Sequence, residues 1–319
     1  MASLRGEPVD HVPLSLWLHN FATENSAETL AAESVRLAHR FEWDFLKPQS
    51  RAQCFAQMWE LRYTPSHERA TPYTVTHAPL ASAADLKRLE PADPKSGALG
   101  EQLRALEIIR KAVGPDTPII WTVFSPLMVL PFLLTGGRAQ AVALMRSDPA
   151  AVNHALDAMA VTLAAYARAA VASGADGLFY ATNMATRELS TVQECRRFQR
   201  PYDLRILSGV ERAPFNLLHV CGAGVLFDEF VDYPATAFSW ATVASNPSLT
   251  EVHRRTGRAV VGGLPAKPEI GSLRPKEIEA RGRRAIAEMG GRYLLLGPDC
   301  SINPDTPEEV MDAATAATR

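Results

Sequence analysis

The chain has 319 residues, and its 33 Lys and Arg residues against 35 Asp and Glu residues give a formal net charge of −2. This balance excludes a polyanion-binding surface as the default, because neutralising phosphates requires an excess of basic residues, so no nucleic-acid partner is expected. With 47% hydrophobic and 21% charged residues, the composition is that of a folded globular protein and not of a disordered or fibrous chain.

The sequence also predicts the cellular compartment. Its most apolar stretch, residues 118–134, is interrupted by polar residues and prolines and falls short of the roughly 20 residues that a membrane span needs. The first eight residues lack the basic start and apolar core of a secretory signal. Four cysteines are too few for a disulfide framework in a chain of this length. We therefore expect a cytoplasmic protein with reduced thiols and no membrane partner.

Short apolar runs, which are strand candidates, alternate with longer stretches of helical periodicity. In chain order the eight predicted strands are residues 11–18, 44–48, 118–124, 177–181, 216–220, 237–240, 259–262 and 293–297. Helix starts are indicated between them by Asp148 before Pro149 and by two capping boxes, Thr191 with Glu194 and Thr306 with Glu309. Strands separated by helices require parallel pairing through crossover connections.

Eight strand-then-helix units in a chain of this length predict one (β/α)8 barrel domain over residues 1–319. An open doubly wound sheet is the competing architecture. It has less support, because no G-x-G-x-x-G motif follows a predicted strand.

Three metal-binding side chains are predicted just past the carboxyl ends of strands, where a barrel places its active site. His219 and Cys221 close the fifth predicted strand, and Cys300 follows the eighth. Residues two apart on a strand project to the same face, so His219 and Cys221 can reach one ion. One imidazole and two thiols are a three-ligand zinc set with an open fourth position. The alternative is that both cysteines are small buried hydrophobes and His219 is a hydrogen-bonded core histidine.

Sequence motifs around these residues resemble the uroporphyrinogen decarboxylase superfamily. They are Asn216-Leu-Leu-His-Val-Cys-Gly222, Val260-Val-Gly-Gly-Leu-Pro265 and Leu296-Gly-Pro-Asp-Cys-Ser-Ile-Asn-Pro-Asp-Thr-Pro-Glu-Glu309, with further similarity at residues 10–13, 174–180 and 200–202. The chain is most similar to the zinc-dependent methyltransferase branch, which includes the methylcobamide:coenzyme M methyltransferases. The resemblance implies a (β/α)8 barrel, Zn²⁺ on His219, Cys221 and Cys300, and a methylcorrinoid supplied by a separate corrinoid-binding protein.

The chain departs from the family pattern in ways that bear on its substrate. Uroporphyrinogen decarboxylases carry an Arg-rich segment after the first strand and a histidine at the position of Cys300. This chain has Leu16-Trp-Leu-His-Asn-Phe21 and a cysteine there, which disfavours porphyrin decarboxylation. Many superfamily members also carry an acidic residue after the sixth strand, where this chain has Ser239 and Trp240.

The predicted ligand set suits methyl transfer. Zn²⁺ with two thiolates and a neutral imidazole carries no net charge, and it lowers the pKa of a bound substrate thiol while leaving the sulfur nucleophilic. The same open position could bind the oxygen of a methyl ether or methanol and help it leave. The ligands therefore leave open the direction of transfer and the choice between a small thiol and a methoxy or methanol-type substrate.

Other polar or aromatic side chains near predicted strand ends are candidate site residues. His19 and Tyr180 are the acid/base candidates, and the substrate-binding candidates are Trp17, Asn20, Asn183, Trp240 and Asn303. The alternative is that the aromatic residues cap the barrel and the asparagines shape turns.

Two other functions remain open. One is a metal-free decarboxylase or lyase of the same barrel, in which Tyr180 and nearby polar groups hold a carboxylated substrate. The other is a regulatory barrel with a redox-sensitive dithiol at Cys221 and Cys300.

Overall fold

Six parallel strands in sequence order form the central sheet of the computed structural model, which describes residues 1–319. They are β3 (Ile120–Phe124), β4 (Gly177–Thr182), β5 (Leu217–Val220), β6 (Ala237–Trp240), β7 (Ala259–Leu264) and β8 (Leu294–Pro298). Their side chains are almost all buried, as expected for a parallel sheet covered on both faces. Six of the eight predicted strands are thereby confirmed.

The first two predicted strands, residues 11–18 and 44–48, are extended segments with isolated bridges and not strands. Leu14 bridges Leu296 next to β8, Leu46 bridges Ile119 next to β3, and the Asp44 N–H donates to the Leu14 carbonyl. A continuous ladder does not form because the Leu14 N–H is bonded by the Asp44 carboxylate, and because prolines within these segments lack an N–H. The two segments nevertheless fill the gap between β8 and β3, so the TIM-barrel arrangement holds.

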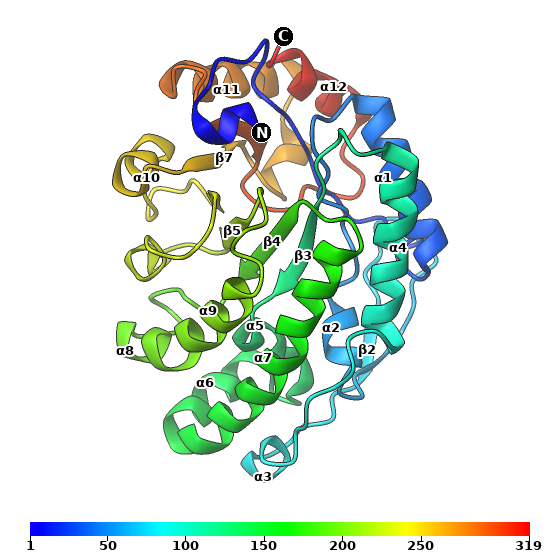
Figure 1. Cartoon of the computed structure of the whole chain (residues 1–319), viewed down its shortest axis with the longest axis vertical. Coiled ribbons are helices and arrows are strands. Elements are labelled where there is room, and N and C mark those ends of the chain that lie inside the picture. Colours follow the sequence, from blue (N-terminus) through cyan, green and yellow to red (C-terminus); the bar gives the residue numbers. More distant parts are fainter.

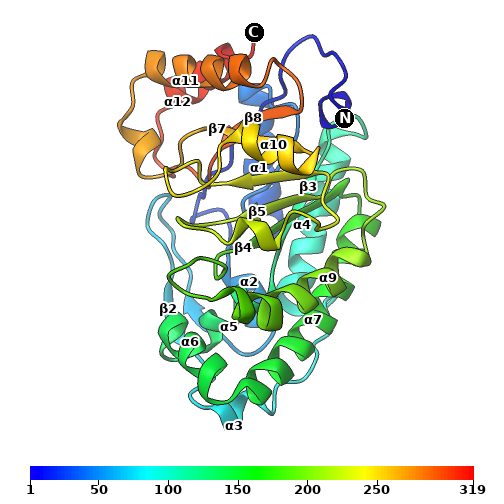
Figure 2. The same cartoon turned by 90° about the vertical axis from the view of Figure 1, so that its left-hand side faces the viewer.

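Helices surround the sheet on its outer side (Figure 1, Figure 2). The α-helices are α1 (Ala27–Phe41), α2 (Gln53–Gln57), α3 (Ala83–Leu86), α4 (Gly97–Val113), α5 (Pro126–Leu133), α6 (Gly137–Ser147), α7 (Pro149–Ala172), α8 (Val192–Glu194), α9 (Arg200–Ser208), α10 (Leu249–Thr256), α11 (Pro275–Glu288) and α12 (Glu308–Ala316). Short helical turns are η1 (Ala2–Arg5), η2 (Cys195–Gln199, a π-helix), η3 (Phe227–Glu229) and η4 (Glu269–Ser272). Both termini lie at the same end of the molecule, near α11 and α12 (Figure 1).

Two of the three predicted helix starts are confirmed by side-chain caps. Asp148 accepts a hydrogen bond from the Ala151 N–H at the start of α7, and Thr191 forms the capping box with Glu194. The capping box at Thr306 is wrong. The Thr306 hydroxyl donates to the Asn303 carbonyl instead, and α12 begins two residues later at Glu308.

A two-stranded hairpin, β1 (Arg62–Thr64) with β2 (Thr74–His77), was not predicted from the sequence. Its side chains are mostly exposed. It therefore lacks the apolar alternation by which a half-buried strand is recognised.

Helix α7 is the one helix that is long and apolar enough to span a membrane by length and composition alone. Within its most apolar window 61% of the residues are buried inside the protein. The helix packs against α9, α5 and β3, which is the arrangement of a core helix.

Candidate metal centre

His219, Cys221 and Cys300 come together at the carboxyl end of the sheet. His219 is the third residue of β5, Cys221 follows the end of that strand, and Cys300 lies two residues past β8. Their side-chain nitrogen and sulfur atoms all lie within 4.8 Å of one another, and the two sulfur atoms are 3.9 Å apart. Gly222, with a φ of 120° that side chains rarely adopt, turns the chain away directly after Cys221.

The imidazole of His219 is oriented for metal binding. Its Nδ1 lies 3.2 Å from the hydroxyl of Ser239 on β6, and its ring stacks on Phe179 of β4 with 5.1 Å between centroids. Its Nε2 is buried and has no hydrogen-bond partner. A buried polar atom without a partner is costly, and a metal-binding histidine commonly bonds a neighbour through its other nitrogen. Nε2 is therefore the atom available to an ion.

The three donors fit a tetrahedral zinc ion. Two thiolates bound at the usual Zn–S length of about 2.3 Å lie about 3.8 Å apart in tetrahedral geometry, close to the distance between the two sulfurs here. Imidazole nitrogen and thiolate sulfur are ligands that zinc prefers, and catalytic zinc sites commonly have three protein ligands.

The electrostatics of this cluster favour a cation. The Cys221 thiol donates a hydrogen bond to the Cys300 sulfur and holds the pKa of Cys300 well below its usual range. Asp299, next in sequence, accepts two hydrogen bonds from Thr242 through Oδ2, while its buried Oδ1 has no partner. Burial raises the pKa of Asp299 to about 6. Asp299 was not predicted, although it lies within the motif that contains Cys300.

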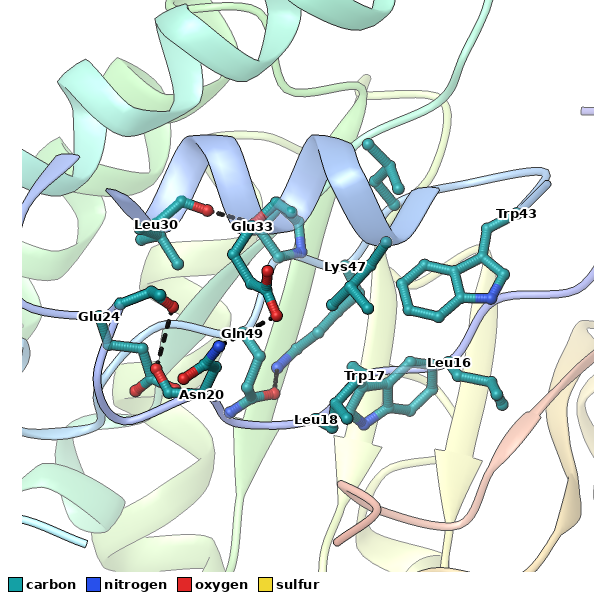
Figure 3. A pocket seen from close by; sticks show the side chains of 15 residues that line it. Leu16, Trp17, Leu18, Asn20, Glu24, Leu30, Glu33, Trp43, Lys47 and Gln49 are labelled. Carbon is teal, nitrogen blue, oxygen red and sulfur yellow. Dashed lines mark hydrogen bonds between the residues drawn. The ribbon is translucent and has the colours of Figure 1, made fainter. Parts of the chain in front are cut away.

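Trp17 and Asn20 line the pocket shown in Figure 3, and His19 lies next to it, since His19 and Asn20 both bond the carboxylate of Glu24. The indole of Trp17 packs edge-on against Phe179, with 5.5 Å between ring centroids. The His19 Nδ1 is 2.8 Å from a carboxylate oxygen of Glu24, and the Asn20 side chain donates to Glu33. Because both ring nitrogens of His19 have protein partners, its acid/base role remains a prediction.

Lys47, which lines the pocket in Figure 3, was not predicted as a site residue from the sequence. Its side chain is 5% exposed, although lysine is rarely buried without a carboxylate partner. Its Nζ donates to Gln49 Oε1 and lies 4.6 Å from the centre of the Phe179 ring. Burial lowers the pKa of Lys47 to about 7. The available clue was its position at the end of a predicted strand.

Tyr180 and Trp240 face away from the metal centre, which corrects both predictions. Side chains alternate along a strand, and Phe179 and Ser239, which contact His219, occupy the inner positions. The Tyr180 hydroxyl therefore points outward and donates to Asp203 of α9 at 2.5 Å. The Trp240 indole N–H donates to the Pro247 carbonyl. Neither side chain points toward the inner face, where His219 lies.

Replacing Tyr180 with phenylalanine is expected to lower the free energy of unfolding by about 1–2 kcal/mol, because a buried hydrogen bond to Asp203 is lost. Turnover per folded molecule should stay within about twofold of wild type. Chemical denaturation and activity assays on the same preparation measure both quantities. A large loss of turnover at unchanged stability would restore the acid/base role of Tyr180.

Asn183 and Asn303, like Trp17 and Asn20, remain candidate substrate-binding residues. Asn183 is half-buried directly after β4. Asn303 follows Cys300 by three residues, and its buried Oδ1 has no hydrogen-bond partner. Both stay predictions, since no contact with the three metal-binding residues supports them.

Comparison with protein families and known sequences agrees with the barrel. The family model described as "Uroporphyrinogen decarboxylase (URO-D)" matches residues 1–319. The methylcobamide:CoM methyltransferase MtaA of Methanosarcina barkeri (strain Fusaro) is 27% identical over 218 residues, which cover 67% of this chain and 62% of that protein. The match thus spans less than two thirds of that relative's length. The uroporphyrinogen decarboxylase of Sorangium cellulosum is 27% identical over 249 residues, 75% of this chain and 68% of that protein.

Among solved structures, a methyltransferase from Methanosarcina mazei matches with a TM-score of 0.85 and 23% sequence identity. The match covers 99% of this chain and 96% of that chain. At this identity the likeness shows a shared fold over the full length.

Proposed function

The chain belongs to the uroporphyrinogen decarboxylase family, and within that family we propose that it is a zinc-dependent methyltransferase. It moves a methyl group between a corrinoid protein, its expected partner, and a small thiol or a methoxy or methanol-type substrate. The observation that carries this proposal is the cluster of His219, Cys221 and Cys300, whose ligand atoms lie within 4.8 Å of one another around a partnerless Nε2. The similarity to a methylcobamide:CoM methyltransferase supports it.

The chain's own residues would hold the ion and shape its surroundings. His219 and Cys221 from β5 and Cys300 from the β8 side would bind zinc, and Ser239 would keep the imidazole in its ligating orientation. When bound, zinc supplies a Lewis acid that lowers the pKa of a thiol or polarises a methoxy oxygen. Phe179 stacks on the His219 ring and Trp17 packs against Phe179, so the histidine side of the cluster is apolar.

Elemental analysis of protein purified without chelators tests the proposal, and we expect about one zinc per chain. The same preparation should demethylate methylcobalamin in the presence of a small thiol, or methylate cob(I)alamin from a methoxy compound or methanol. Loss of the methylcobalamin absorbance follows the first reaction and its appearance follows the second. A metal-free chain with neither activity would contradict the proposal.

A metal-free decarboxylase is the second candidate, favoured by the similarity to uroporphyrinogen decarboxylases. Its predicted carboxylate-binding residue, Tyr180, faces Asp203 instead of the inner face. Unimpaired turnover of a carboxylated substrate after exhaustive chelation would favour this candidate. The redox alternative rests on the 3.9 Å between the two sulfurs, and a reversible disulfide in freshly purified, metal-free protein would favour it.

A further inference from the structure

Lys47 is a buried basic side chain that nothing in the proposed function uses. Its ammonium group has three N–H donors, and its only hydrogen-bond acceptor is Gln49 Oε1. No carboxylate lies within ion-pair distance. Burial without a contacting carboxylate lowers the pKa of Lys47 to about 7, so an anion that arrives nearby favours its protonated form and is in turn stabilised by it.

A hydrogen-bond network of Glu24, His19 and Gln49 fixes the position of the Lys47 ammonium group. Glu24, which is 1% exposed, accepts the Nδ1–H of His19, and so the His19 Nε2 must be an acceptor. Gln49 donates its amide N–H to that nitrogen at 2.9 Å, which turns its Oε1 toward Lys47. Figure 3 shows Glu24, Gln49 and Lys47 around the same pocket. The orientation of the Gln49 amide is therefore set by the network.

The ammonium group lies beside the metal centre. The Phe179 ring contacts both Lys47 and His219. Its centre lies 4.6 Å from Lys47 Nζ and 5.1 Å from the centre of the His219 imidazole. These two distances place the ammonium group within about 10 Å of the imidazole. Both groups contact the same apolar ring and both side chains are buried, so solvent screens their interaction less than it would at the surface.

We propose that Lys47 is a positioning residue of this site, whose positive charge favours a thiolate over a neutral ligand at the metal. The inference rests on the proposed function. Zinc with two thiolates and a neutral imidazole is uncharged, and a substrate thiolate brings the centre to −1. The Lys47 ammonium offsets that charge, whereas a neutral methyl ether or alcohol gains nothing from it.

Thiol binding to the Co²⁺-substituted protein tests this inference, because a sulfur ligand adds a charge-transfer band to the Co²⁺ spectrum. Ethanethiol is the anionic ligand once bound, and imidazole is the neutral comparison. In Lys47→Met we expect the ethanethiol affinity to fall about tenfold, the effect of one charge at this distance. The imidazole affinity should change by less than about twofold. Lys47→Arg, which keeps the charge, should retain the thiol affinity within about threefold.

Lys111→Met is the matched control, because the same substitution is made at an exposed lysine of α4 and should change neither affinity. Gln49→Leu removes the acceptor of the ammonium group and should weaken ethanethiol about threefold, which keeps the test available if Lys47→Met does not fold. Equal losses for both ligands, or an unchanged thiol affinity, would overturn the inference alone. A wild-type protein that binds no Co²⁺ would overturn the proposed function together with it.

Discussion

Replacing Cys300 with serine is expected to lower the zinc affinity by at least about 100-fold and to abolish methyl transfer. A serine hydroxyl is not deprotonated near neutral pH and is a poor zinc ligand, and even the loss of a group that only orients a ligand costs 10–100-fold. The zinc content after dialysis against a chelator of known affinity measures the first effect. Methylcobalamin turnover in the same samples measures the second.

Cys195→Ala provides the control for Cys300→Ser. Cys195 is buried at the start of η2, where burial raises the pKa of its thiol to about 12, and it belongs to no metal-binding cluster. This variant should keep the full zinc content. If Cys300→Ser kept its zinc and its full activity, the three-ligand site would be wrong.

Asp203 is expected to make the protein less stable as the pH rises from about 4 to about 7. Its fully buried carboxyl group accepts hydrogen bonds from Tyr180, Gln199 and Tyr233. Burial nevertheless raises the pKa of Asp203 to about 7. Between its unfolded pKa of about 3.9 and this value the folded state binds more protons than the unfolded state, so stability is lost with increasing pH. The full loss amounts to about 4 kcal/mol.

The difference in unfolding free energy between wild type and Asp203→Asn, measured by denaturant titration across this pH range, isolates the contribution of Asp203. Relative to the variant, wild type should lose stability with a slope of about 1.4 kcal/mol per pH unit. Asp157→Asn, at an exposed aspartate that pairs with Arg205, should show no such slope. Parallel curves for wild type and Asp203→Asn would show that Asp203 is ionised at all these pH values.

The sequence was sufficient to predict the barrel arrangement and the proximity of His219, Cys221 and Cys300, because both follow from the pattern of strands. Six strands were found from apolar runs between helix caps, and the i, i+2 spacing of His219 and Cys221 predicted that their side chains lie on the same face, as they do. Cys300 was placed with them because it follows the eighth predicted strand, and a barrel brings the carboxyl ends of its strands to one mouth. The resemblance to known methyltransferases strengthened that expectation.

The sequence did not show which strand residues face the inside of the barrel, because residues that face inward and outward are direct neighbours on a strand. Tyr180 and Trp240 were candidates because they lie near strand ends, whereas their neighbours Phe179 and Ser239 are the residues that face His219. Side chains alternate between the two faces of a strand, so one residue of known orientation would fix the others. The strands of a fully buried sheet are apolar on both faces, so their sequence does not show which residues point inward. Lys47 was overlooked because a lone lysine ordinarily indicates an exposed position.

The two cysteines of the cluster are separated by two intervening strands, β6 and β7, in the sheet. An ion held by both would act as a cross-link between distant parts of the chain, closing a loop of about 80 residues. Ligand binding to the folded state alone raises its stability with the free ligand concentration. Metal supply would then govern how long the protein survives heat or proteases, independently of whether any substrate is present.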